Sequence, residues 1–127
     1  MGGQNKMSLK FTNYDDYILI ESPTGMDYWE IIESIPELIS MPEFKNKNDI
    51  WLFRSGQIKM AYADLYSIKN LVKEICPKNS KGAKTAIVAE NGLQQSLATL
   101  YSGIGKDLQR EIRVFSDLKS AENWILE

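Results

Sequence analysis

The sequence predicts an α/β domain built on a mostly parallel sheet of five strands, with an antiparallel first strand and about four helices. Short apolar runs alternate with amphipathic stretches at helical spacing along most of the chain. Residues 8–13 and 17–21 are two runs joined by a short polar turn, which is typical of a hairpin. Strands that alternate with helices after such a hairpin imply parallel pairing through right-handed crossovers.

The first half of the chain predicts one long helix and one strand after the hairpin. Apolar residues recur at helical spacing over residues 28–39, and Asp27 or Thr24 is suited to cap this helix. Pro36 removes one intrahelical hydrogen bond, so we expect a kink or a break into two short helices there. The apolar run over residues 50–53 is expected to form the next strand.

The second half predicts a helix followed by two strand-helix units. The elements are a helix over residues 63–76, a strand over 85–89, a helix over 91–104, a strand over 112–115 and a final helix. Ser116 or Asp117 is expected to cap the final helix. Its inward residues are expected to be Leu118, Ala121, Trp124 and Ile125. Asn91 with Gln94 has the form of a capping box. In the helix that follows, Leu93, Leu97, Leu100, Tyr101 and Ile104 are expected to share one face.

Length and composition limit the class of protein. The 127 residues suffice for one domain, which we expect over residues 8–127, with residues 1–7 as a disordered tail or an added segment. A net charge of −2 gives no long-range positive field that would attract nucleic acid. No apolar run reaches the length of a bilayer span, and the first residues lack the apolar core of a signal peptide, so we expect a cytoplasmic protein.

Histidine is absent from the chain, and Cys76 is its one cysteine. The chain therefore lacks the side chain best suited to general base catalysis near neutral pH, which is also the commonest ligand of transition metals. A single thiol excludes an internal disulfide and a multi-thiolate zinc site. We expect no enzymatic activity, no metal site and no cofactor, and we expect Cys76 to be a buried or half-buried, inert thiol.

Several short stretches carry a family resemblance. They are Trp29 with residues 41–44, the Ser55-Gly56 step, residues 88–91 with Leu97 and Tyr101, and residues 113–117 with Ala121, Trp124 and Ile125. In these stretches the chain resembles the STAS group, the anti-sigma-factor-antagonist-like domains, and more closely its little-characterised SpoIIAA-like bacterial branch, which shares topology with CRAL-TRIO lipid-binding domains. The resemblance implies a SpoIIAA-like β-α superhelix from about residue 17 onward, and its motifs are structural ones.

Antagonists of this family carry an Asp-Ser-Ser-Gly stretch at the start of the second helix, and phosphorylation of its second serine releases a partner. Counted without gaps from Ser55-Gly56, this stretch falls on residues 61–64, and Ala63 stands where the phosphorylated serine would be. The resemblance thus implies a binding module without the family's serine switch. Asp64 is then either a plain helix cap or a fixed negative charge near the regulated position.

The loop and helix start over residues 54–67 form the predicted binding surface. The predicted partner- or ligand-binding residues are Arg54, Ser55, Tyr62, Asp64 and Tyr66. Arg54 and Ser55 follow a strand, at the sheet edge where open α/β sheets bind ligands. Tyr62 and Tyr66 are expected to be exposed, and exposed tyrosines are typical of protein-binding surfaces. The leading hypothesis is a non-enzymatic module that binds a protein partner here.

The alternative hypothesis is a carrier or sensor of a lipid or small apolar ligand held between sheet and helices. The aromatic residues that could line such a site are Tyr28, Trp29, Trp51, Phe53, Tyr62, Tyr66 and Tyr101. A carrier of this kind predicts a cavity on the order of several hundred Å³, whereas a packed core predicts almost none. An open sheet with a hairpin at its edge also leaves pairing with a second copy open.

Overall fold

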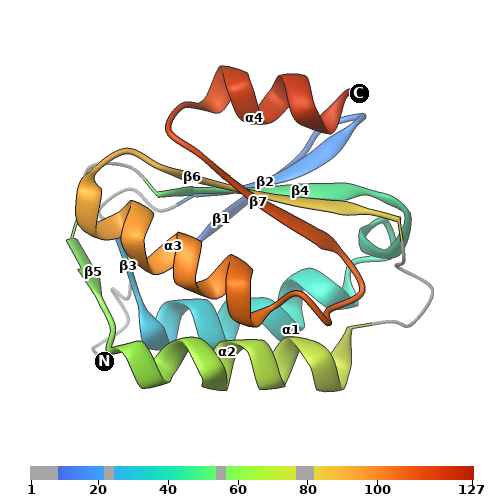
Figure 1. Ribbon diagram of the computed structural model, residues 1–127. Helices are drawn as coiled ribbons and strands as arrows, with labels where there is room; N and C mark the ends of the chain where they lie inside the picture. The colour runs from blue at the N-terminus through green and yellow to red at the C-terminus, as the bar shows by residue number, and fades with distance from the viewer. Residues whose placement is uncertain (1–8, 22–24, 54–56, 77–81) are drawn as a thin grey trace, which may run out of the picture.

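The structure, a computed structural model, describes residues 9–21, 25–53, 57–76 and 82–127. Its centre is a five-stranded sheet in the order β1-β2-β4-β6-β7 (Figure 1). The strands are β1 (Lys10–Asn13), β2 (Tyr17–Glu21), β4 (Asn48–Phe53), β6 (Lys84–Ala89) and β7 (Glu111–Phe115). β1 pairs antiparallel with β2, and all other pairs in this sheet are parallel. The predicted mostly parallel sheet with an antiparallel first strand is confirmed.

Three helices cover one face of the sheet and one helix covers the other (Figure 1). The first three are α1 (Tyr28–Ser40), α2 (Tyr62–Ile75) and α3 (Gly92–Ile104), and the fourth is α4 (Leu118–Ile125). α2 contacts both α1 and α3, so it lies between them. The four predicted helices are thus all present, and a short 3-10 helix, η2 (Phe44–Asn46), follows α1.

A second, two-stranded sheet was not predicted from the sequence. Its strands are β3 (Gly25–Asp27) and β5 (Gln57–Lys59), which pair in parallel. β3 runs directly into α1, and β5 precedes α2 by two residues. This small sheet therefore joins the chain segments that lead into two neighbouring helices.

The helix starts follow the predicted caps. The Asp27 carboxylate accepts a hydrogen bond from the Glu30 N–H at 2.8 Å, and Glu30 in turn accepts one from the Asp27 N–H at 3.0 Å. Asn91 caps α3 and Asp117 caps α4 in the same way, each by accepting a bond from the N–H three residues on. These contacts satisfy N–H groups that a helix start otherwise leaves without partners.

In two helices the structure differs from part of what was expected. Pro36 does not break α1 into two helices, since one helix runs from Tyr28 to Ser40. Pro36 lies on the exposed side of α1. The opposite side packs into the core through the buried residues Ile31, Ser34, Ile35 and Leu38. In α3, Leu93 and Leu100 are exposed, whereas Gln94 and Ala98 are the buried residues. The inner face of α3 is therefore rotated away from the predicted one.

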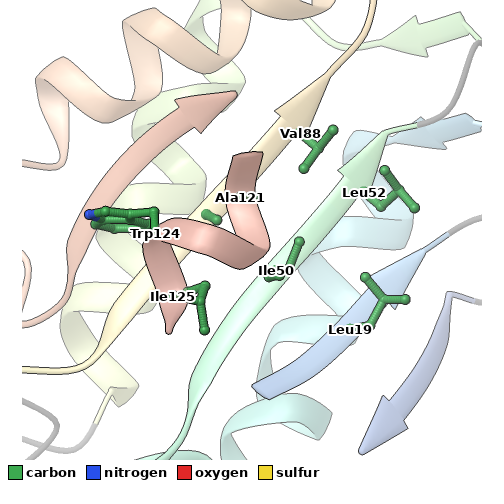
Figure 2. Packing of buried hydrophobic residues seen from close by; sticks show 8 residues of the cluster. Leu19, Ile50, Leu52, Val88, Ala121, Trp124 and Ile125 are labelled. Atoms are coloured by element: carbon green, nitrogen blue, oxygen red, sulfur yellow. The ribbon is translucent and has the colours of Figure 1, made fainter. Parts of the chain in front are cut away.

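The core has one layer on each face of the sheet. On the α4 face the buried residues are Leu19, Ile50, Leu52, Ala86, Val88, Ala121, Trp124 and Ile125. Figure 2 shows Ala121, Trp124 and Ile125 of α4 lying over the side chains of the strands. On the α1–α3 face the strands contribute Phe53, Ile87 and Ala89. Because neighbouring residues of β4 and β6 point to opposite faces, both strands are buried on both sides, as β6 was predicted to be.

In the part of the chain that the structure describes, no helix combines the length and the apolar character needed to cross a bilayer.

Candidate functional site

Helices α1, α2 and α3 all begin on the same side of the molecule (Figure 1). Since β4, β6 and β7 run parallel, their carboxyl ends lie at the same edge, and α3 begins there directly after β6. α1 and α2 begin at the same side, after β3 and β5 (Figure 1). Of the predicted binding residues, Tyr62, Asp64 and Tyr66 lie in the first two turns of α2. Arg54 and Ser55 fall outside the described residues.

Tyr62 and Tyr66 form an exposed aromatic pair one turn apart on α2. Their side chains are 52% and 43% exposed. The two rings meet edge to face, with centroids 5.7 Å apart and an angle of 71° between the planes. The two hydroxyl oxygens lie 3.4 Å apart, and the hydrogen bond between them raises the pKa of Tyr62. The pair therefore presents one continuous aromatic surface with a polar tip.

Asp64 acts as part of the cap of α2. Its Oδ2 accepts a hydrogen bond from the Ala61 N–H at 2.7 Å. Ala61 has no side-chain acceptor of its own, so Asp64 provides the only side-chain contact at this cap among the described residues. Of the two roles considered for Asp64, the helix cap is supported by this direct hydrogen bond.

Two further large apolar side chains are exposed at the same edge. Trp29, the second residue of α1, is 66% exposed, and Leu93, the second residue of α3, is 64% exposed. Sequence reasoning assigned Trp29 to the aromatic set of a cavity and Leu93 to an apolar helix face. The exposure of Trp29 could have been predicted from the sequence, because at 100° per residue Trp29 lies on the opposite side of the helix from the apolar residues Ile31 and Ile35. We call Trp29, Tyr62, Tyr66 and Leu93 the helix-start surface.

A cavity of about 110 Å³ lies between the sheet and helices α1, α2 and α3. Most of its wall is apolar, and it includes Ile35, Phe53, Leu65, Ile68, Ile87 and Ala98. Of the predicted aromatic set, Trp51, Phe53 and Tyr101 line the cavity, whereas Trp29, Tyr62 and Tyr66 are exposed. The volume is smaller than the several hundred Å³ expected of a lipid carrier and larger than a fully packed core would leave.

One end of the cavity is polar because of Arg110, which is only 6% exposed. Its Nη1 donates to Asp49 Oδ1 at 2.9 Å and to the Lys47 carbonyl at 2.6 Å, and its Nη2 donates to the Phe44 carbonyl. The guanidinium carbon lies 3.6 Å from the centre of the Phe44 ring. Arg110 Nε is buried and has no hydrogen-bond partner among the described residues.

Asp49 completes this polar end. Besides Arg110, its carboxylate accepts hydrogen bonds from Thr85 Oγ1 at 2.7 Å and from Trp51 Nε1 at 2.8 Å. Burial raises the pKa of Asp49 and outweighs the lowering by Arg110 and the two other donors. Arg110, Thr85 and Trp51 all donate hydrogen bonds to the Asp49 carboxylate, which can accept all three without carrying a proton. The ionised form is the one that fits these contacts.

Tyr101 and Cys76 also line the cavity. Burial, with a further contribution from the Asp49 carboxylate, raises the pKa of Tyr101, so its hydroxyl stays protonated. Cys76 is half-buried, as expected of a structural thiol. The described residues contain no group of three or more histidine, cysteine, aspartate or glutamate side chains placed to hold a metal ion.

Comparison with solved structures assigns this arrangement to the SpoIIAA-like fold. One matching structure is an uncharacterised protein of the DUF3478 family from Shewanella loihica PV-4, described as having a SpoIIAA-like fold. The match has a TM-score of 0.55 and 14% identity, and it covers 94% of this chain and 93% of the other. No protein-family model and no curated protein sequence matches the chain. The fold that the resemblance implied is thus confirmed, and at this identity the likeness concerns the fold alone.

Proposed function

We propose that the chain is a cytoplasmic, non-enzymatic binding module that engages a protein partner through the helix-start surface. The observation that carries this proposal is that exposed apolar side chains recur at helix starts on one side of the molecule. The described residues include seven exposed large hydrophobic side chains, and four of them, Trp29, Tyr62, Tyr66 and Leu93, lie in the first two turns of three adjacent helices. Arg54 and Ser55, which follow β4 in the sequence and lie outside the described residues, remain predicted members of the same surface.

The chemistry of these side chains supports a protein partner. Tryptophan and tyrosine are enriched at the centres of protein interfaces, where they bury a large area. A tryptophan is buried for most of its area in an ordinary domain, so a Trp29 that is 66% exposed lacks the packing that its side chain favours.

Capture of the partner from the protein's own cells tests the proposal. Three tagged forms are compared, namely wild type, the double variant Tyr62→Ala/Tyr66→Ala, and Tyr14→Ala as a matched control. Tyr14 is also an exposed tyrosine, but it lies in the β1-β2 turn at the amino end of the parallel strands. We expect the double variant to recover at least about tenfold less of the partner and the control to recover as much as wild type. Equal recovery by all three forms would reject the helix-start surface.

A second candidate function is binding of a small apolar molecule in the cavity. The observation in its favour is the volume of about 110 Å³ behind a mainly apolar wall. An engineered apolar cavity of roughly 150 Å³ stays dry and binds benzene, whereas pockets for drug-sized ligands have roughly 300–1,000 Å³. The cavity therefore suits a molecule smaller than a lipid. A methyl NMR titration with small hydrocarbons, repeated on an Ala98→Leu variant whose cavity is partly filled, tests this candidate.

A further inference from the structure

The polar end of the cavity specifies the chemistry of its ligand. We infer that the cavity takes a small neutral molecule whose apolar body fills the space between sheet and helices and whose single oxygen acceptor, a carbonyl or ether oxygen, binds the Arg110 Nε–H. This inference rests on the second candidate function, the use of the cavity as a binding site.

The need for an acceptor follows from the contacts of Arg110. Its two terminal nitrogens donate to Asp49, Lys47 and Phe44, while Nε has no partner among the described residues. A buried donor on a charged group is rarely left unsatisfied in a native protein. Arg110 lines the cavity, so an acceptor at this end of the cavity can reach the guanidinium side chain. Either a ligand oxygen or a trapped water can fill this role.

The neutral charge of the ligand follows from Asp49. Among the described residues that line the cavity, Arg110 is the only cation and Asp49 is the only carboxylate, and the two are paired at 2.9 Å. The site therefore has no net charge before a ligand enters. A carboxylate ligand would place a second negative charge beside Asp49 with no further cation to pair with it, and burial of an unpaired charge is strongly unfavourable.

The size and polarity of the ligand follow from the rest of the wall. Apart from Arg110 and Asp49, the wall is mostly aliphatic and aromatic side chains from the sheet and from α1, α2 and α3. A volume of about 110 Å³ is somewhat below the roughly 150 Å³ that holds benzene, which sets an upper limit of about six non-hydrogen atoms. A small cyclic or branched ketone, aldehyde or ether has this composition.

Three probes of similar size separate the alternatives. Cyclopentanone has the acceptor, methylenecyclopentane has the same shape with a CH₂ group in place of the oxygen, and butanoate carries a negative charge. The readout is the ¹H–¹⁵N signal of Arg110 Nε–H together with the methyl signals of Leu65 and Ile87. The chain has three arginines, so this signal is assigned in Arg54→Lys and Arg113→Lys variants.

We expect cyclopentanone to shift the Arg110 Nε–H signal saturably and to bind about tenfold more tightly than methylenecyclopentane, because only the ketone makes the hydrogen bond. Butanoate is expected to give no saturable shift. Ala98→Leu is expected to abolish binding of both neutral probes by filling the cavity, and Ala98→Val serves if the leucine variant does not fold. Leu100→Ala, on the exposed side of α3, is the control that leaves binding unchanged.

Other results overturn the inference in distinguishable ways. Equal affinity for the ketone and the hydrocarbon would reject the role of Arg110 Nε but leave the cavity as a ligand site. Tightest binding of butanoate would reject a neutral ligand. A long-lived water on Arg110 Nε that persists at saturating cyclopentanone would show that water is the partner. Absence of binding by all three probes would reject the inference and the second candidate function together.

Discussion

Replacement of Asp49 by asparagine is expected to lower the free energy of unfolding by about 3–5 kcal/mol. The substitution keeps the size of the side chain but removes the charge that faces Arg110 Nη1 at 2.9 Å. The Asp49 and Arg110 side chains are only 4% and 5% exposed, so water cannot replace the lost charge. The Asp49 carboxylate accepts hydrogen bonds from Arg110, Thr85 and Trp51 through two oxygens. The asparagine amide has only one acceptor oxygen, so at least one of these hydrogen bonds is lost.

Urea unfolding followed by far-ultraviolet circular dichroism measures this loss. Domains have total stabilities of about 5–15 kcal/mol, so the Asp49→Asn variant should lose a large share of its stability. The free energy of unfolding of a small protein falls by about 1–3 kcal/mol per molar urea, so the urea concentration at the unfolding midpoint should fall by roughly 2 M. Asp15→Asn, at an exposed aspartate of the β1-β2 turn, should leave the midpoint unchanged. A loss below about 1 kcal/mol for Asp49→Asn would refute the reasoning that the buried pair depends on the charge of Asp49.

Three smaller effects follow from single contacts. The Lys73 ammonium group holds the pKa of Asp107 at about 2, so this contact stabilises the folded state above about pH 4 and is lost as the pH falls toward 2. An NMR titration of the Asp107 carboxyl group should show a higher titration midpoint in Lys73→Ala than in wild type. An unchanged midpoint would contradict the role of Lys73. Tyr17→Phe removes the 2.6 Å hydrogen bond from the Tyr17 hydroxyl to Glu122, which should lower the free energy of urea unfolding by about 1 kcal/mol. Asn91→Ala removes the cap of α3 and should also lower it by about 1 kcal/mol, whereas stability equal to wild type would show that the cap is dispensable.

Local patterns were sufficient to predict the fold. Each apolar run and each helical repeat lies within a short segment, and caps such as Asp27, Asn91 and Asp117 act over three residues. β3 and β5 escaped prediction because each has three residues, too few for a periodic pattern. The break that was one of two alternatives at Pro36 does not occur, because the packing of α1 against the core outweighs one missing hydrogen bond.

The candidate sites were predictable only in part. Exposure of Tyr62 and Tyr66 was expected from their place at a helix start, and both are exposed. The pair of Asp49 and Arg110 joins residues 61 positions apart, and no local pattern relates the start of β4 to the residue before β7. The only local signal was an aspartate directly before the apolar run of a buried strand, which resembles an ordinary loop boundary.

Photo-crosslinking in the protein's own cells tests the proposed binding surface most directly. A photoreactive phenylalanine analogue is placed at position 66, on the helix-start surface, or at position 14, in the β1-β2 turn. Both positions hold tyrosines that are 43% and 46% exposed, so the two probes differ in location and not in accessibility. The proposal predicts a discrete crosslinked protein from position 66 and none from position 14. Crosslinking from position 14 alone, or the same product from both positions, would contradict it.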